Sequence, residues 1–236
     1  MVNETDLTAE KKWLFQKKAE TAIQNLKKKN INALYVDNSQ EALQKVLEMI
    51  PEGVMVVRGD SVTLDQIGIF PALKKRRQNK LIDPLERNPD GSFVIPEDRQ
   101  KRFAREAFDA GVFLSGVNAV TLDGRLVFTD GRGNRVAPVI YGPDKVILVA
   151  GANKLVNNLE EAILRIREVA APLNARRHFT KHQAPDFGNL PCVRTGKCAD
   201  CNLDWRICNY TVVIEGAMVW EKNRINLVLV GEELGI

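Results

Sequence analysis

The chain has 236 residues, of which 44% are hydrophobic and 27% charged, as is usual for a globular domain with a buried core. Lysines and arginines number 34 against 30 acidic residues, and aromatic residues make up only 6%, which argues against nucleic-acid binding. The polar start MVNETDLTAEKKW lacks the apolar run of a secretory signal, and no stretch approaches the roughly 20 apolar residues of a membrane span. We therefore expect a cytoplasmic protein, in which disulfides rarely persist.

The first half of the chain alternates helix and strand signals. Apolar spacing predicts a helix over 8–29, a strand over 32–36 and a helix over 39–50. The run GVMVV (53–57) is entirely apolar, as expected for a parallel strand buried on both faces. Because alternating strands and helices assemble into parallel sheets, the sequence predicts an α/β fold, a mostly parallel sheet with helices on both faces.

The second half carries more strand signals. A helix over 96–110 precedes two β-rich runs around Asp123-Gly124, a dipeptide typical of tight hairpins, and then the buried strand KVILVAG. An amphipathic helix is predicted over 152–172, ending at Pro172. A loop-rich segment of about 38 residues follows, longer than most loops without a function. YTVVIEGAMVW and RINLVLVGEELG then close the chain as strands.

The loop RGDSVT follows a predicted buried strand and carries residues suited to binding an anion. Backbone N–H groups and small hydroxyls at the start of a helix can face a phosphate or carboxylate. The loop also lies at the carboxyl end of a parallel strand, where open α/β sheets bind ligands. A β–α turn in which Ser61 or Thr63 caps the helix is the simpler alternative. The candidate ligand-binding residues here are Gly59, Ser61 and Thr63.

Two further loops, within 115–138 and 151–154, are predicted at the same edge of the sheet. Gly124 is explained by the predicted hairpin. The segment DGRGNR (130–135) is not: it combines flexible glycine backbone with the guanidinium of Arg135, and together these could hold a carboxylate or phosphate. The helix dipole disfavours a lysine in a first turn, so a bound anion would rationalise Lys154; a solvated surface lysine is the alternative. The candidates in these loops are Asn118, Gly131, Gly133, Asn134, Arg135 and Lys154.

The two histidines, His178 and His182, are four residues apart, but Pro172 and Pro185 flank them and no carboxylate completes a metal motif. We interpret them as surface residues, with a supporting role beside the cysteines as the alternative. No Ser-His-Asp or Cys-His arrangement typical of a hydrolase is visible, and no catalytic residue is assigned.

All four cysteines of the chain lie within PCVRTGKCADCNLDWRIC (191–208). A C-x2-C pair places two thiolates on one turn, and flanking cysteines can complete a tetrahedral set for a metal. Two disulfides are the alternative, disfavoured in the cytoplasm. The spacing leaves zinc and a [4Fe–4S] iron–sulfur cluster both open. We expect a Cys-rich metal-binding lobe (172–209) inserted in an α/β domain (1–171 and 210–236), with the ligands Cys192, Cys198, Cys201 and Cys208.

Three segments of the chain carry a resemblance to a known family. They are GVNAVTLDGRLVFTDGRGNRVAPVIYGPDKVILVAGANKLV, RIREVAAPLNARRH and PCVRTGKCADCNLDWRICN. With them the chain resembles the LUD-domain family, named for lactate utilisation, and most of all its single-domain members with a C-terminal cysteine cluster. The resemblance runs over nearly the whole chain. It implies a fold like that of ribose-5-phosphate isomerase, glucosamine-6-phosphate deaminase and CoA transferases, and iron–sulfur partner proteins that oxidise lactate to pyruvate.

The chain departs from the enzymes of that fold. Ser115 and Asn118 stand where the isomerases carry acids, so the natural general base for sugar isomerisation is missing, and no glutamate is placed as a CoA-transferase nucleophile. We therefore expect a protein that binds a small anionic metabolite, a 2-hydroxy acid or a phosphorylated compound, with electron transfer through a cluster. The alternatives are a non-redox isomerase or transferase with a structural zinc, and a metabolite-binding regulatory module. A homo-oligomer is compatible with each.

Overall fold

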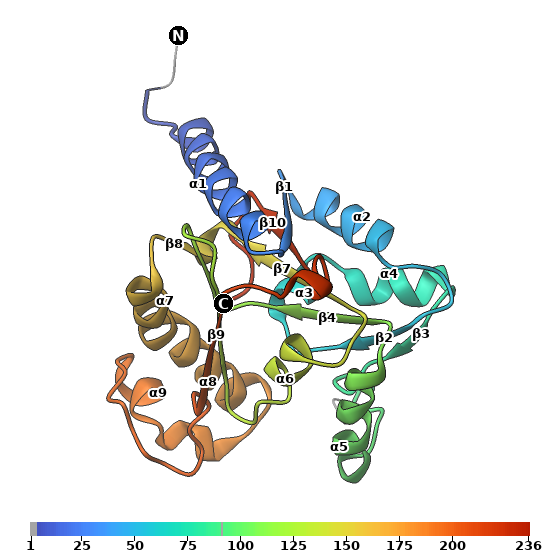
Figure 1. The fold of residues 1–236 in the computed structure, drawn as a ribbon. Coiled ribbons are helices and arrows are strands. Elements are labelled where there is room, and N and C mark those ends of the chain that lie inside the picture. The colour runs from blue at the N-terminus through green and yellow to red at the C-terminus, as the bar shows by residue number, and fades with distance from the viewer. Residues whose placement is uncertain (1–3, 91) are drawn as a thin grey trace.

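The computed structural model describes residues 4–90 and 92–236 (Figure 1). Within these residues, two sheets and the helices around them form the α/β fold that the sequence predicts. Among the described helices, none combines the length and the apolar character needed to cross a membrane.

The larger sheet has six strands within the described residues, and all of its strand pairs are parallel. The predicted strands over 32–36 and 145–151 are confirmed, and the strand predicted over 53–57 begins at Met55. KVILVAG reads as a continuous apolar run because both faces of its strand are covered. The strand order is β1 (Asn32–Val36), β10 (Ile225–Val230), β7 (Lys145–Gly151), β4 (Val112–Gly116), β2 (Met55–Arg58) and β3 (Lys80–Ile82).

Alternate side chains of each strand pack into two separate cores, one on either face of the larger sheet. Ile147 and Val149 face the core completed by α2 (Ser39–Met49), α3 (Val62–Gln66) and α4 (Ile69–Arg76). Val146 and Leu148 face the core to which α1 (Thr8–Lys28), α6 (Val136–Ile140) and the smaller sheet contribute. The prediction of helices on both faces is therefore confirmed (Figure 1).

The smaller sheet lies on the α1 side of the larger one, in the order β8 (Leu155–Val156), β5 (Ala119–Thr121), β6 (Leu126–Asp130) and β9 (Tyr210–Ile214). β5 and β6 form the hairpin predicted at Asp123-Gly124. Gly124 has a φ of +84°, a left-handed conformation that glycine adopts without a steric penalty. Ala119 and Val127 of this sheet pack against α7 (Leu159–Arg165).

The prediction of a helix over 152–172 is wrong at both ends. The segment begins with a 3-10 turn, η2 (Ala152–Lys154), and β8, and it becomes helical only at Leu159. It then runs past Pro172 through a π-helical turn, η3 (Ile166–Ala170), into α8 (Ala171–Lys181). A proline inside a helix lacks its N–H and clashes with the carbonyl four residues earlier, and the wider π turn just before it relieves that clash.

The remaining elements are short. α5 (Glu97–Arg105) and η1 (Glu106–Asp109) replace the single helix predicted over 96–110. After α8 come η4 (Pro185–Asn189) and α9 (Pro191–Thr195), and residues 196–209 form no helix or strand in the structure. The strand predicted over 210–220 ends at Ile214 and is followed by η5 (Val219–Glu221). The continuous helix from α7 to α8 crosses the domain boundary that we placed between residues 171 and 172, and this division of the chain stays a prediction.

Candidate functional site

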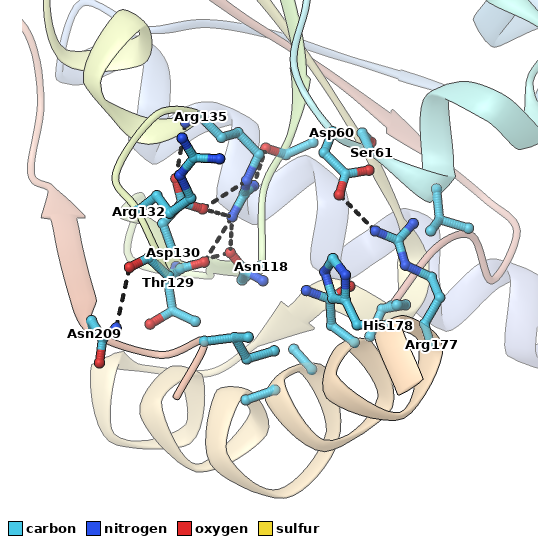
Figure 2. A pocket seen from close by; sticks show the side chains of 18 of the residues that line it. Asp60, Ser61, Asn118, Thr129, Asp130, Arg132, Arg135, Arg177, His178 and Asn209 are labelled. Atoms are coloured by element: carbon cyan, nitrogen blue, oxygen red, sulfur yellow. Dashed lines mark hydrogen bonds and ion pairs between the residues drawn. The ribbon is translucent and has the colours of Figure 1, made fainter. Parts of the chain in front are cut away.

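A cavity of about 460 Å³ opens beside the carboxyl ends of β2 and β4. Its walls include the turn after β2, the loops after β4 and β6, η2, α8 and the Cys-rich segment. Figure 2 shows Asp60 and Ser61, from the turn after β2, facing Arg177 and His178 of α8. The cavity thus lies at the edge of the parallel sheet where ligands bind in open α/β folds.

Most of the predicted ligand-binding residues meet at this cavity. Gly59 does not line it, and its N–H donates to the carbonyl of Leu114 at 2.7 Å. Gly133 forms a left-handed turn before α6, with a φ of +75°, and Thr63 lies behind Lys154 as its hydrogen-bond partner. Ligand binding by the nine residues stays a prediction. Those that line the cavity are Ser61, Asn118, Gly131, Asn134, Arg135 and Lys154.

Arg135 clamps the loops after β4 and β6 together (Figure 2). Its Nε donates to Asp130 Oδ1 at 2.9 Å and its Nη1 donates to the carbonyl of Gly116 at 3.0 Å. Its Nη2 donates to Asn118 Oδ1 at 2.8 Å and to the carbonyl of Thr129 at 2.9 Å. The side chains of Arg135 and Asp130 are only 12% and 7% exposed. These contacts give Arg135 a structural role, and they occupy most of its five N–H groups.

Lys154 is buried, so the alternative of a solvated surface lysine is wrong. Its Nζ donates to Thr63 Oγ1 at 3.0 Å, and among the residues that the structure describes no carboxylate forms an ion pair with it. Burial, together with the positive charges of Arg165 and Arg135, lowers the pKa of Lys154 from 10.5 to about 7. A buried ammonium group with only a neutral partner is costly, and an anion in the cavity would offset that cost.

Ser61 approaches the cavity because Gly116 has no side chain. A Cβ on Gly116 would lie 2.6 Å from Ser61 Oγ, closer than real Cβ contacts allow. Ser61 Oγ also accepts the N–H of Leu64 at 3.4 Å, so the capping role expected as the simpler alternative is confirmed. A hydroxyl that accepts one hydrogen bond still has a hydrogen to donate. Capping α3 and binding a ligand are therefore compatible roles.

Asp60 and Arg177 form an ion pair in the wall opposite the Arg135 clamp, and neither residue was among the predicted ones. Arg177 Nη2 donates to Asp60 Oδ2 at 2.6 Å (Figure 2). Burial alone would raise the pKa of Asp60, but Arg177, helped by Arg135 and His178, outweighs burial and lowers this pKa. Asp60 is therefore ionised at neutral pH and balances the charge of Arg177.

His178 lines the cavity next to this ion pair. Its Nδ1 lies 3.0 Å from Nδ1 of His182, and its ring stacks on Phe187 with centroids 4.9 Å apart. Burial and the charge of Arg177 lower the pKa of His178, and burial and His178 lower that of His182 to about 4. Both rings are therefore neutral at pH 7. Their interpretation as plain surface residues is wrong, because both side chains are half-buried and His178 lines the cavity. Phe187, on which His178 stacks, also contacts Trp205 of the Cys-rich segment.

The cavity residues on α8 follow a spacing that the sequence contains. Asn174, Arg177 and His178 lie at positions i, i+3 and i+4, which share one face of a helix. The prediction that Pro172 ends the preceding helix concealed this pattern. Pro172 stands instead inside the continuous helix, directly after the π-helical turn that accommodates it.

The charges around the cavity favour an anion. Among the described lining residues, five have a lysine or arginine side chain and three have an aspartate side chain. Asp60 pairs with Arg177 and Asp130 pairs with Arg135, which leaves Lys154 as the buried charge without a counterion. The lining charges are Arg132, Arg135, Lys154, Arg177 and Arg206 against Asp60, Asp130 and Asp204.

The four cysteines lie between α8 and β9 as free thiols. Burial raises the pKa of Cys192, and the negative charges of Cys201, Cys208 and Cys198 raise it further. The N–H of Asp200 donates to Cys198 Sγ at 3.5 Å. Four soft thiols with an N–H donor beside them fit zinc or an iron–sulfur cluster. In residues 4–90 and 92–236, no three metal-ligating side chains are gathered as a coordination sphere, and metal binding stays a prediction.

The match to a family model agrees with the resemblance seen in the sequence. Residues 19–230 match the model of the LUD domain family. A crystal structure of a DUF162 family protein from Deinococcus radiodurans is similar at 11% sequence identity, over 93% of this chain and 97% of that chain, with a TM-score of 0.47. No curated protein matches the chain. Because the family match spans most of its length, the protein belongs to the LUD domain family.

Proposed function

We propose that the cavity binds a small anionic metabolite, and that Lys154 is the residue that attracts it. The observation that carries the proposal is the buried ammonium group of Lys154, which has a neutral hydrogen-bond partner and no carboxylate partner among the described residues. A carboxylate or phosphate oxygen in the cavity would supply the missing charge and accept a charge-assisted hydrogen bond.

Other residues of the cavity complete the binding of such a ligand. The hydroxyl of Ser61 can donate to the same anionic group, since it lies in the wall formed by the turn after β2. Arg135 holds Asn118 and Asp130 in place, and so fixes the loops after β4 and β6 beside the cavity. These roles follow from the positions of the side chains around one cavity.

A 2-hydroxy acid fits this arrangement, and the LUD domain family is linked to lactate utilisation. Its carboxylate would bind Lys154 at one side of the cavity. Its hydroxyl would lie toward His178, which is neutral at pH 7 and can accept or donate a hydrogen bond. The opposite charges of Asp60 and Arg177 balance each other there, so Arg177 does not compete with Lys154 for the carboxylate.

We extend the proposal to the four cysteines. Cys192, Cys198, Cys201 and Cys208 would hold the metal, and Arg206, which donates to the carbonyl of Cys201 at 2.6 Å, would offset part of the thiolate charge. A bound iron–sulfur cluster would supply one-electron transfer beside the cavity, and a bound zinc would supply a structural cross-link.

Two measurements test this function. A thermal-shift screen of wild type and Lys154→Met against 2-hydroxy acids, sugar phosphates and CoA esters should show stabilisation of wild type by 2-hydroxy acids, because a ligand that binds the folded state raises Tm. Stabilisation by sugar phosphates alone would favour the isomerase or transferase. Anaerobic purification followed by metal analysis and visible spectroscopy separates the metals, and a colourless protein with one zinc would contradict electron transfer.

A further inference from the structure

The Cys-rich segment and the cavity share residues. Of the six residues between Cys201 and Cys208, the last four line the cavity, and so does Asn209, which directly follows Cys208. We call residues 204–209 the shared wall. Anything that fixes the positions of Cys201 and Cys208 therefore also restricts the shared wall.

The shared wall touches the rest of the cavity at a few points. The backbone N–H of Asn209 donates to the carbonyl of Asp130 at 3.0 Å, and its Nδ2 donates to the carbonyl of Gly131 at 3.2 Å. A Cβ on Gly131 would lie 3.2 Å from Cα of Ile207, so the two backbones are in close contact. Figure 2 shows Asn209 at the same side of the cavity as Thr129 and Asp130. The shared wall thus completes the cavity beside the loop after β6.

The shared wall has no strand or helix of its own, since residues 196–209 form neither. Segments held by so few backbone contacts open at low free energy. Arg206 provides the internal link: its Nη1 donates to the carbonyl of Cys201 at 2.6 Å and its Nη2 donates to Asp200 Oδ1 at 3.1 Å. Because Arg206 also lines the cavity, one side chain touches both the cysteine loop and the ligand space.

We propose that the four-thiol site and the cavity are coupled, so that a metal held by the thiols raises the affinity of the cavity for its anion. The coupling rests on the proposed function, because it needs both a metal at the cysteines and an anion at Lys154. A metal that fixes Cys201 and Cys208 orders the shared wall in advance, and the anion then meets a completed cavity. Linkage requires the anion to raise the metal affinity by the same factor.

Electrostatic repulsion opposes this coupling, because four thiolates bound to a metal bring negative charge toward the cavity and so disfavour a second anion there. Arg206 lies between the cysteines and the ligand space and offsets part of that charge. We expect the ordering of the shared wall to exceed the remaining repulsion, since exposed charges are strongly screened by water and salt. The sign of the coupling is therefore a direct test of the proposal.

The experiment measures both affinities on the full chain, kept reduced and stripped of metal with a chelator. Zn²⁺ is the metal probe, and L-lactate and inorganic phosphate are the anion probes. Calorimetry gives the anion Kd with and without Zn²⁺, and a competing chelator gives the Zn²⁺ Kd with and without the anion. We expect the anion to bind at least about fivefold more tightly to the zinc form, with the same factor in the reverse measurement.

Asn209→Ala removes a contact of the shared wall and leaves all four cysteines in place. It should keep the Zn²⁺ affinity measured without anion and reduce the coupling factor toward one. Asn25→Ala is the matched control, because Asn25 Nδ2 likewise donates to a backbone carbonyl, that of Leu122 at 2.8 Å, away from the cavity. The Asn25→Ala variant should keep the full coupling factor of wild type.

The outcomes separate the coupling from the function on which it rests. An anion that binds equally to both forms, or less tightly to the zinc form, overturns the coupling and leaves the anion site intact. Absence of Zn²⁺ binding, or equal loss of coupling in Asn209→Ala and Asn25→Ala, also overturns it. Absence of anion binding in both forms contradicts the proposed function itself, and the coupling with it.

Discussion

Lys154 and Thr63 are joined by a hydrogen bond of 3.0 Å between an ammonium group and a hydroxyl, and both side chains are buried. The lysine comes from η2 after β7 and the threonine from α3 after β2, so the bond connects two residues that are 91 positions apart in the sequence. Since the hydroxyl carries no charge, it does not balance the positive charge of Lys154, which lines the cavity.

Lys154→Met should make the protein more stable at pH 7 in the absence of ligand. The pKa of Lys154 is about 7 in the folded protein and 10.5 when the chain is unfolded, so the unfolded state binds more protons between these values. Stability of wild type therefore rises as the pH increases from 7 to 10.5, and at pH 7 the buried lysine costs about 4 kcal/mol. Urea unfolding should show a gain of this order for Lys154→Met at pH 7 and a flatter pH dependence.

The matched control for this variant is Lys145→Met. Lys145 Nζ donates to the carbonyl of Met49 at 3.0 Å, outside the cavity, and its loss should not increase stability. A Lys154→Met variant that is less stable than wild type at pH 7 would contradict the burial of an unbalanced charge at this position.

Binding of L-lactate should weaken as the pH rises above 7. The carboxylate of lactate stays ionised throughout this range, whereas Lys154 loses its proton with a pKa of about 7. Since the anion prefers the protonated lysine, its Kd should increase by about tenfold per pH unit well above that pKa. Calorimetry between pH 6 and 9 measures this, and a Kd that stays constant over the range would argue against Lys154 as the binding cation.

Asp130→Asn should destabilise the fold, because it removes the charge that balances Arg135. The pair is buried, and Asp130 also accepts the backbone N–H of Arg135 at 3.1 Å. Removing one partner of a buried ion pair leaves the other charge uncompensated, at a cost of about 3 kcal/mol. The control is Asp123→Asn, whose partner Arg125 lies at the surface, where ion pairs contribute little. Equal midpoints of urea unfolding for both variants would contradict the clamp.

His182→Gln should make the protein more resistant to acid. Burial first, and then the charges of His178 and Arg177, lower the pKa of His182 to about 4, below the 6.5 of an unfolded histidine. The unfolded state therefore binds more protons between pH 6.5 and 4, and wild type loses stability as the pH falls through this window. Urea unfolding at pH 7.5 and 4.5 should show a smaller loss for His182→Gln than for the control Lys181→Gln. The same loss of stability in both variants would contradict the lowered pKa of His182.

Much of the fold follows from local sequence signals. The apolar runs 53–57 and 145–151 indicated buried strands, and Asp123-Gly124 indicated the hairpin, because these patterns depend on near neighbours in the chain. Pro172 was misleading because the π-helical turn that accommodates it has no clear signal in the sequence.

The residues of the candidate site were predictable only where a single loop contains a recognisable pattern of glycines and polar side chains. The glycines and polar residues of the three loops identified Ser61, Asn118 and Lys154, which the structure brings to one cavity. Asp60 and Arg177 were missed because their ion pair joins positions 117 residues apart, and neither residue stands in a recognisable motif. The position of the Cys-rich segment against the cavity depends on tertiary contacts in the same way.

The central claim is that Lys154 makes the cavity an anion site, and the most direct test is the calorimetric Kd of L-lactate at pH 6.5 for wild type, Lys154→Met and Lys145→Met. We predict saturable binding of one lactate by wild type and Lys145→Met, and binding weaker by about tenfold to a hundredfold in Lys154→Met, since a hydrogen bond to a charged group contributes about 1.5–3 kcal/mol. Equal affinity in a folded Lys154→Met protein would contradict the account.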